Sequence, residues 1–352
     1  MRYVSIFSGI EAASAAWEPL GWEPIAFSEN DQFPSAVLQE RYPAVPNLGD
    51  IREIDWSKHE QCLSADIIVG GSPCQSFSLA GTRTGLHGAS GLMWEYVRAV
   101  REIRPRWLLW ENVPGAFSSS HGEDFRCLLQ ALDDIGYGLA WRVLDAEFFG
   151  VAQRRRRLFL VGSLGSTRAG EVLFDSDSLR WDHPTSRQKR QALAEDAQKG
   201  PRTADAGGLN GSADDIAGER PDDDAIMCAS NTGTNASIEM NIAPTLTAHD
   251  AKSTTYVFAG QNSAKAGLSL DRNTCPTLSV TKTPQVAAGG LVRRLTPMEC
   301  ERLQGFPDGW TDIPYRGRPH APDSARYRAL GNSMAVPVMA WLGRRLERAD
   351  EA

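Results

Sequence analysis

The sequence predicts an α/β fold: a doubly wound, mostly parallel sheet, joined by a smaller, irregular strand-and-loop second domain. Residues 1–163 alternate short apolar runs with amphipathic stretches, which is typical of strands connected by helices. From 165 to 290 this alternation stops and no helical period is visible, and ordered patterning returns at Arg293. At 352 residues the chain is longer than one average domain, which also favours two parts.

Five apolar runs are predicted to form the strands of the main sheet. They are Tyr3–Phe7, Pro24–Ser28, Ala65–Val69, Trp107–Trp110 and Arg157–Val161. Helices are predicted between them at Leu92–Ile103 and Asp124–Leu132. Ligands bind such sheets beyond the carboxyl ends of the strands, so motifs that follow these runs are the candidates for a site.

The middle of the chain is predicted to be a separate domain. Residues 165–290 would interrupt a catalytic domain made of 1–164 and 291–352. The stretch Arg187–Asp224 is rich in Ala, Asp, Gly and Arg and is expected to be mobile. A weak repeat with a period of 32, AlaProThrLeuThrAla at 243–248 and CysProThrLeuSerVal at 275–280, is interpreted as a strand-and-loop scaffold.

A helix after the insert is marked at both ends. Thr296 can cap it, Pro297 occupies its first turn, Glu299 completes a capping box, and Gly305 ends it. A final helix is predicted from about Val336 to Arg348. These elements suggest that the C-terminus packs back onto the first domain.

The composition is that of a globular protein. Hydrophobic residues make up 41% of the chain and charged residues 23%. With 37 basic and 44 acidic residues the net charge is −7, which argues against a nucleic-acid coat but not against an enzyme with a basic cleft. No segment reaches the roughly 18 apolar residues of a membrane span, and the first residues resemble a strand more than a signal peptide. A cytoplasmic protein with no membrane partner is expected.

The six cysteines predict neither a metal site nor a disulfide framework. They stand at 62, 74, 127, 228, 275 and 300, without any CxxC pair. A reducing compartment is the simplest interpretation, and it leaves any one cysteine free to act as a nucleophile.

One cysteine lies in a distinctive context. Gly70-Gly71-Ser72-Pro73-Cys74-Gln75-Ser76-Phe77-Ser78 directly follows a predicted strand. A cysteine alone is more often a small buried apolar residue. Behind a rigid proline and two glycines, however, Cys74 is well placed to be an exposed nucleophile.

This motif resembles the catalytic signature of the cytosine-5 DNA methyltransferase family of bacterial or phage type. Further segments match that family in its own order. They are PheSerGlyIleGluAla at 7–12, GluAsn at 29–30, GlyAspIle at 49–51, GluAsnVal at 111–113, Gln-Arg-Arg-Arg-Arg at 153–157, ArgLeuThrProMetGluCysGluArgLeuGlnGlyPhePro at 294–307 and GlyAsnSerMetAlaValPro at 331–337. The resemblance covers roughly 1–163 and 291–345, and it implies a Rossmann-like S-adenosylmethionine-dependent methyltransferase fold.

The resemblance assigns the catalytic roles, and the chemistry agrees with them. A thiolate of Cys74 adding to C6 of cytosine would make C5 nucleophilic toward a methyl group. Addition pushes charge toward N3, where Glu111 would act as the acid if its pKa is raised. Arg157 would hold the cytosine O2, and Arg155 would support the catalytic loop and a phosphate.

The resemblance also implies S-adenosylmethionine as cofactor. The residues implied to contact it are Phe7, Gly9, Ile10, Glu29, Asn30, Asp50, Ile51, Pro73, Leu92, Asn332 and Ser333. Glu29 suits the ribose hydroxyls, Asp50 the adenine amino group, and Ile10 and Ile51 the faces of the ring. The family usually has two further glycines where this chain has Glu11 and Ala12.

Double-stranded DNA is the implied partner, with the target cytosine flipped out of the helix. The loop Ser76–Ser90 is expected to be mobile and to close over the flipped base. Ser76 and Arg83 in this loop, and Gln153 beyond it, are candidate DNA contacts. The segment 165–290 stands where the family keeps its target-recognition domain, in which Lys252 and Lys282 would touch phosphates or base edges.

Two alternatives stay open. One is a cytosine-5 methyltransferase that acts on transfer RNA, and the other is a catalytically silent DNA-binding homologue. An insert of about 125 residues favours DNA, and the presence of Cys74, Glu111, Arg157 and Asn332 favours activity. The sequence leaves open the recognition site, the oligomeric state, and whether a cognate restriction endonuclease is a further partner.

Overall fold

A computed structural model describes most of the two parts of the predicted catalytic domain and little of the insert. The residues described in full are 1–72, 91–117, 122–174 and 294–351. Between 175 and 293 only the backbone of six short strands is described.

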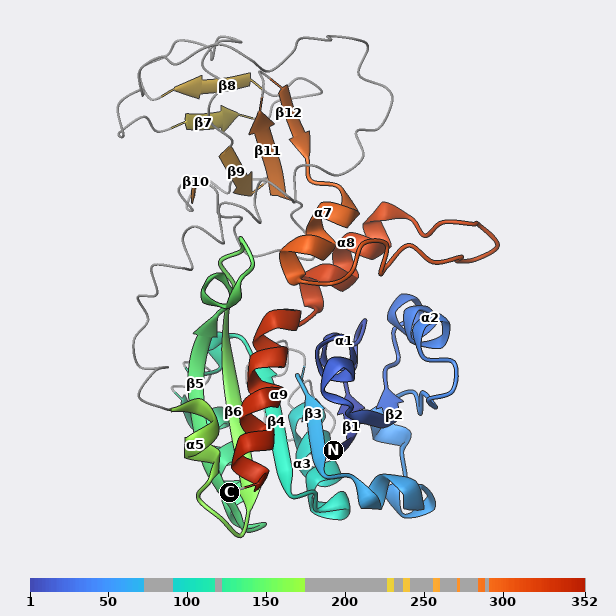
Figure 1. Cartoon of the computed structure of the whole chain (residues 1–352), viewed down its shortest axis with the longest axis vertical. Coiled ribbons are helices and arrows are strands. Elements are labelled where there is room, and N and C mark those ends of the chain that lie inside the picture. The colour runs from blue at the N-terminus through green and yellow to red at the C-terminus, as the bar shows by residue number, and fades with distance from the viewer. Residues whose placement is uncertain are drawn as a thin grey trace, which may run out of the picture.

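The main sheet has six strands in the order β2-β1-β3-β4-β6-β5 (Figure 1). They are β1 (Arg2–Ile6), β2 (Glu23–Ser28), β3 (Ile67–Gly70), β4 (Trp107–Asn112), β5 (Tyr137–Asp145) and β6 (Arg156–Leu164). The first four strands pair in parallel, whereas β6 is antiparallel to both of its neighbours. The predicted mostly parallel α/β sheet is therefore confirmed, with β6 reversed among its six strands.

The helices of the described residues are α1 (Ala12–Trp17), α2 (Gln32–Arg41), α3 (Gly91–Ile103), α4 (Glu123–Asp133), α5 (Ala169–Leu173), α7 (Pro297–Gln304), α8 (Asp323–Asn332) and α9 (Val336–Glu351). Helices cover both faces of the main sheet, whereas α7 and α8 lie above it in Figure 1. Short 3-10 helices lie at Glu18–Leu20, Ile51–Glu53, Trp56–Lys58, Glu60–Ser64, Pro114–Phe117 and Ala146–Phe149.

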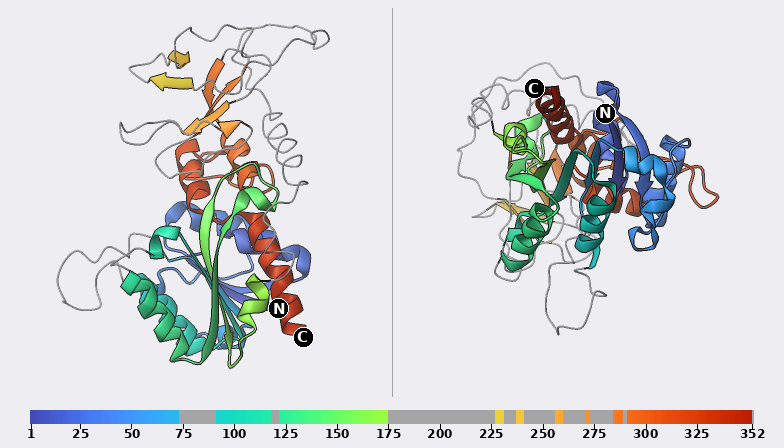
Figure 2. Two further views of the ribbon diagram at one scale, coloured as in Figure 1. Left: turned by 90° about the vertical axis from the view of Figure 1, so that its left-hand side faces the viewer. Right: turned by 90° about the horizontal axis from the view of Figure 1, so that it is seen from below.

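The strands alternate their side chains between two cores. In β4, Leu108 and Trp110 are buried on the face that α3 and α4 cover, while Trp107 and Leu109 are buried on the face that α1 and α9 cover. Figure 2 shows this layering, with the teal helices on one side of the strands and the red helix α9 on the other. Strands buried on both faces explain the continuous apolar runs in the sequence.

The C-terminal helix completes the core beneath α1, as the sequence predicts. Trp17 Nε1 donates to the carbonyl of Met339 in α9 over 2.8 Å. A Cβ on Gly343 would lie 2.6 Å from the Trp17 ring, so glycine is needed for this close approach. The two ends of the described chain are thus packed against one sheet face.

Six further strands lie in the expected insert and directly after it. They are β7 (Met227–Ser230), β8 (Ser237–Met240), β9 (Tyr256–Ala259), β10 (Asp271–Arg272), β11 (Pro284–Ala288) and β12 (Leu291–Arg294). They form a four-stranded sheet, β10-β9-β11-β12, and a two-stranded sheet, β7-β8, above the main sheet in Figure 1. The repeat at 243–248 and 275–280 and the stretch Arg187–Asp224 lie outside the described residues.

The boundaries of the insert stay a prediction, and two elements bear on them. Although α5 begins after residue 165, its Ala169, Val172 and Leu173 are buried in the core that contains α9. β12 begins at Leu291 but pairs with β11 of the insert. The chain therefore crosses between the two parts a few residues away from 165 and 290.

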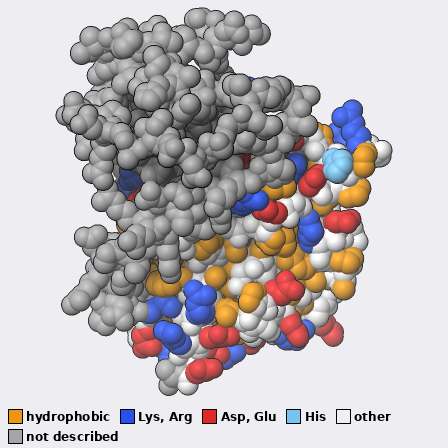
Figure 3. Space-filling view, turned by 45° about the horizontal axis from the view of Figure 1, so that its top comes forward, with side chains coloured by type: hydrophobic (Ala, Val, Ile, Leu, Met, Phe, Trp, Pro, Cys, Tyr) orange, Lys and Arg blue, Asp and Glu red, His pale blue; other side chains and the backbone are white. Residues whose placement is uncertain are grey.

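The described surface carries both signs of charge. In Figure 3 acidic and basic side chains are interspersed with apolar ones over the part of the molecule that is coloured. None of the helices in the described part of the chain combines the length and apolar character that crossing a membrane requires.

Candidate active site

The candidate site lies where the carboxyl ends of the parallel strands meet the beginning of β6. Because β6 is reversed, its first residues stand beside the last residues of β4, with Glu111 opposite Phe159 and Asn112 opposite Leu158. The end of β3 adjoins the end of β4, with Gly70 opposite Trp110. Segments far apart in the sequence therefore converge at one edge of the sheet.

Glu111 and Arg157 form an ion pair at this edge. Arg157 Nε lies 3.1 Å from Glu111 Oε1, and the two side chains are 15% and 12% exposed. Burial raises the pKa of the Glu111 carboxyl, while the charges of Arg157 and Arg155 oppose that rise. The structure thus brings together two of the predicted catalytic residues, with a carboxyl that holds its proton more readily than a free glutamate.

The two glycines before Ser72 are required by close approaches of the backbone. A Cβ on Gly70 would lie 2.4 Å from the carbonyl oxygen of Ile6 in β1. A Cβ on Gly71 would lie 2.7 Å from Glu111 Oε2 and 3.0 Å from the Glu111 carbonyl oxygen. The glycine pair therefore lets the end of β3 lie directly against the Glu111 carboxyl.

Ser72 is anchored by the neighbouring strand. Trp110 Nε1 donates to Ser72 Oγ over 3.2 Å, and Asn112 Nδ2 donates to the Ser72 carbonyl over 3.0 Å. Neither contact was predicted from the sequence, although Asn112 stands inside the GluAsnVal motif. They fix the point from which the chain continues toward Cys74.

Several predicted site residues lie outside the described part of the chain. They are Pro73, Cys74, Ser76, Arg83, Lys252 and Lys282. Their roles in catalysis, cofactor binding and DNA binding stay predictions.

Gln153 and Arg155 are interior residues. Gln153 is fully buried and its Nε2 donates to the carbonyl of Leu303 in α7 over 3.0 Å. Arg155 is 2% exposed, and its Nη2 donates to the carbonyls of Gly331 and Ser333 over 3.1 and 2.6 Å. Both side chains attach the C-terminal helices to the segment that leads into β6. The expected contacts of Gln153 with DNA and of Arg155 with a phosphate stay predictions.

The turn after β1, residues 7–11, has an unusual backbone. Phe7, Gly9 and Glu11 all have positive φ angles, of 54°, 57° and 64°. Glu11 stands where the family that the motifs resemble usually has glycine. It adopts the left-handed conformation that glycine favours. Its Oε1 accepts from the backbone N–H of Ser14 over 3.0 Å and so caps α1. The sequence therefore departs from the motif at a position whose backbone is left-handed.

Acidic residues flank this turn. The backbone N–H of Gly9 donates to Glu29 Oε2 over 2.8 Å, which ties the ends of β1 and β2 together. Asn30 Nδ2 donates to Asp50 Oδ2 over 3.1 Å, and hydrogen bonds from Arg52 hold the pKa of Asp50 well below its usual range. Carboxylates of this kind accept from hydroxyl and amino groups, which is the chemistry a nucleoside requires.

The apolar residues predicted at the cofactor site divide into two groups. Phe7 and Leu92 are partly exposed and pack beside the core under α3. Ile10 is fully buried and Ile51 is 2% exposed. The expected packing of these two side chains on an adenine ring stays a prediction. Apolar side chains at the edge, together with the acidic acceptors, fit a nucleoside-containing cofactor.

The two residues predicted to bind the cofactor at the end of α8 differ in their exposure. Asn332 is exposed, while Ser333 is buried and its carbonyl accepts from Arg155. Among the residues that the structure describes, no group of three or more His, Cys, Asp or Glu side chains is arranged to hold a metal ion.

Comparison with known proteins agrees with these motifs. A family model described as C-5 cytosine-specific DNA methylase matches residues 1–348. A DNA N-6-adenine-methyltransferase of Escherichia phage P1 is 33% identical across 99% of the chain, which spans 61% of that relative's length. The orphan methyltransferase M.SPRI of Bacillus phage SPR is 26% identical over 96% of the chain and 95% of its own length.

Solved structures share the fold. A protein described as a DNA modification methyltransferase encoded within an Escherichia coli prophage superposes with a TM-score of 0.64 at 21% identity, over 100% of both chains. The Dnmt2 methyltransferase of S. pombe superposes with a TM-score of 0.65 at 16% identity, over 99% of each chain.

Proposed function

Because this chain belongs to the C-5 cytosine-specific DNA methylase family, we propose that it methylates carbon 5 of a cytosine in a specific sequence of duplex DNA. The observation that carries the proposal is the Glu111–Arg157 pair, 3.1 Å apart, directly beside the glycines that lead to Cys74. A largely buried acid, an arginine and a cysteine segment at one sheet edge suit addition to a pyrimidine ring.

The proposed reaction begins at a flipped-out cytosine. The thiolate of Cys74 forms a bond to C6 while the Glu111 carboxyl donates a proton to N3, and Arg157 donates to O2. C5 then carries the electron pair that attacks the methyl group. A base or water then takes the C5 proton, and the electron pair of the C5–H bond re-forms the C5–C6 double bond as the C6–sulfur bond breaks and the thiolate leaves. N3 returns its proton to Glu111, so that one proton in total passes to solvent.

S-adenosylmethionine would supply the methyl group as a sulfonium electrophile. The turn at 7–11, the carboxylates of Glu29 and Asp50, and the partly exposed side chains of Phe7 and Leu92 would hold it. Glu29 would accept from the ribose hydroxyls and Asp50 from the adenine amino group.

Methylation of adenine N6 is the second candidate, because a relative at 33% identity is named for that activity. An amino nitrogen can attack a methyl sulfonium without a covalent adduct, so that reaction gives no role to a cysteine nucleophile. The cysteine motif and the protonatable Glu111 beside Arg157 favour the cytosine reaction.

The test is methyl transfer from tritiated S-adenosylmethionine to unmethylated duplex DNA and to transfer RNA, followed by digestion to nucleosides. We expect label in 5-methylcytosine from DNA. Label in N6-methyladenine, or label in transfer RNA alone, would overturn the proposed substrate. If neither the DNA nor the transfer RNA were labelled, the proposal that the protein is a methyltransferase would be overturned. Bisulfite sequencing of DNA from expressing cells would then show the recognition site.

Substitution of the nucleophile tests the covalent step. We expect Cys74→Ser to abolish turnover while the affinity for S-adenosylhomocysteine, measured by calorimetry, stays within about twofold, because a hydroxyl is far less ionised than a thiol near neutral pH. Cys127→Ser, at a half-buried cysteine on α4, is the matched control and should keep its activity. Near-normal rates in Cys74→Ser would refute the covalent mechanism.

A cytoplasmic location and a cognate restriction endonuclease as partner stay predictions.

A further inference from the structure

The backbone of the 7–11 turn needs support from its surroundings. Its two non-glycine residues with positive φ, Phe7 and Glu11, occupy a conformation that L-amino acids avoid. Such conformations persist only when neighbouring contacts determine them, and they are common at ligand sites. The same turn supplies the Gly9 amide that binds Glu29, so any movement of it also displaces an expected ribose ligand.

One side chain from a distant part of the sequence holds the middle of this turn. Trp310 Nε1 donates to the carbonyl of Ile10 over 2.9 Å, across a separation of 300 residues. Trp310 lies in the segment between α7 and α8 and is 9% exposed. Neither the function proposed above nor the motifs in the sequence give this tryptophan a role.

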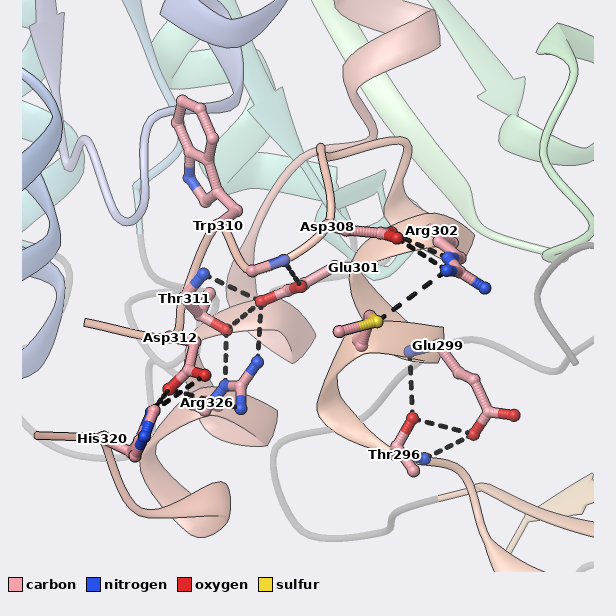
Figure 4. Close-up of polar contacts among 12 residues, drawn as sticks. Thr296, Glu299, Glu301, Arg302, Asp308, Trp310, Thr311, Asp312, His320 and Arg326 are labelled. Carbon is pink, nitrogen blue, oxygen red and sulfur yellow. Dashed lines mark hydrogen bonds and ion pairs between the residues drawn. The ribbon is translucent and has the colours of Figure 1, made fainter. Parts of the chain in front are cut away.

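Trp310 is itself fixed by a buried carboxylate. Glu301 of α7 is fully buried, and it accepts from the backbone N–H of Gly309 over 2.7 Å and of Thr311 over 2.8 Å. Arg326 of α8 donates to Glu301 over 3.1 Å and to Thr311 Oγ1 over 2.9 Å (Figure 4). The carboxylate thus holds the residues on both sides of Trp310, and Arg326 neutralises its charge.

A second cation holds Trp310 from the side of α2. Arg41 Nε donates to the Trp310 carbonyl over 3.1 Å, and its guanidinium carbon lies 5.2 Å from the centre of the indole ring. The ring of Phe306 packs 5.4 Å from the indole. Backbone and ring are therefore both constrained, which fixes the direction in which Nε1 points.

We propose that Trp310, held by Glu301 and Arg41, is a positioning residue that keeps the 7–11 turn in the backbone conformation that binds the cofactor. The proposal rests on the proposed function, because it takes that turn to be the S-adenosylmethionine site. It assigns the segment between α7 and α8 a role in cofactor affinity rather than in chemistry on the base.

The test removes the indole N–H together with the smaller ring of the indole, and the control makes the same change elsewhere. Trp310→Phe keeps an aromatic ring against Phe306 and Arg41 but cannot donate to Ile10. Trp107→Phe is the matched control, since Trp107 Nε1 donates to Asp350 over 2.9 Å from the first residue of β4, at the opposite end of the strand from Glu111. Three quantities are compared with wild type: the Kd for S-adenosylhomocysteine, the melting temperature, and hydrogen–deuterium exchange of the amides at 8–13.

We expect Trp310→Phe to raise the Kd about three- to tenfold, in line with the loss of one hydrogen bond, and to speed amide exchange at 8–13. Both variants should lower the melting temperature by a similar amount. Trp107→Phe should nevertheless leave the Kd and the exchange of the amides at 8–13 within about twofold of wild type. A Trp310→Phe variant with wild-type Kd and wild-type exchange overturns the proposal, as does an equal rise of Kd in both variants.

Binding by the wild-type protein separates failure of the proposed function from failure of this proposal. If wild type binds no S-adenosyl compound, the proposed function fails and with it the role in cofactor affinity. If wild type binds and only Trp310→Phe is weakened, with faster exchange in the turn, the positioning role is supported.

Discussion

At the scale of single residues, Glu111 is subject to two opposing influences on its pKa. Burial raises the pKa, and the charges of Arg157 and Arg155 oppose the rise, with an upward shift as the result. A protonated carboxyl can donate to N3 of cytosine, whereas a carboxylate cannot. We expect Glu111→Gln to lower the single-turnover rate of methyl transfer by about 10²–10⁴-fold.

The pH profile distinguishes an acid from a purely structural carboxylate. Because the protonated form is the active one, the wild-type rate should fall as pH rises through the raised pKa of Glu111, and Glu111→Gln should lack that fall. Glu123→Gln, at an exposed ion pair with Arg126, is the control and should keep the wild-type profile. A loss under about threefold in Glu111→Gln would mean that the acid lies elsewhere.

Substitution of Gly71 tests whether the reaction depends on the exact position of the Glu111 carboxyl. In Gly71→Ala the new Cβ would lie 2.7 Å from Glu111 Oε2 and 3.0 Å from its carbonyl oxygen, so β3 or Glu111 must move. We expect the single-turnover rate to fall about 10–100-fold, since small displacements of reacting groups have effects of this size. Gly170→Ala is the control, because that glycine of α5 has open space around its Cβ position, and it should be neutral or slightly stabilising. A wild-type rate in Gly71→Ala would show that Glu111 tolerates displacement.

The family resemblance predicted that Glu111 and Arg157 act together, and the structure brings them within 3.1 Å. The reversal of β6, which puts Arg157 beside the end of β4, was not predicted. The sequence could not predict that Gln153 and Arg155 are interior, since their partners in α7, in α8 and directly after α8 lie 150 or more residues away. Trp310 was missed for the same reason: a single indole N–H leaves no pattern in the sequence.

At the scale of elements, all five predicted strands are present because each contains a buried apolar run, and all but the edge strand β2 contribute to both cores. β5 was missed, and its burial shows why. Along Tyr137–Asp145 buried and partly exposed residues do not alternate, as the strand lies at the edge of the sheet beside β6 alone. α1 was missed because it has six residues, too few to show a helical period.

The capping box of α7 is confirmed and gives a stability prediction. Thr296 Oγ1 accepts from the N–H of Glu299 over 3.2 Å, and Glu299 Oε2 accepts from the N–H of Thr296 over 2.6 Å. We expect Thr296→Ala to lower the free energy of unfolding by about 0.5–2 kcal/mol, measured by urea denaturation. Thr296→Ser keeps the hydroxyl and should stay near wild type; an equal loss in both variants would locate the effect in the methyl group instead.

At the scale of the whole molecule, one core is built from both ends of the described chain. Trp17 of α1 is fully buried against α9, and Leu342 and Leu346 of α9 are fully buried in the same core. Folding of the N-terminal half therefore depends on residues that follow the insert.

Truncation tests this dependence. Removal of residues 295–352 uncovers the apolar face of α1 and of the sheet, so we expect the product to be insoluble or to lose cooperative thermal unfolding. Removal of 351–352 alone is the control, because it keeps Asp350, which accepts from Arg106 and Trp107. A soluble 1–294 fragment that unfolds cooperatively near the wild-type temperature would contradict this account.

The contact between Trp17 and Met339 also has a consequence for the nascent chain. The two residues are 322 positions apart, and a ribosome adding about 5–20 residues per second needs on the order of 15–65 s to synthesise the second after the first. During that interval the apolar side of α1 has no helix to cover it. Translation speed and chaperone binding should therefore affect the yield of folded protein strongly. The effect should be smaller for a protein whose core forms from residues close together in the sequence.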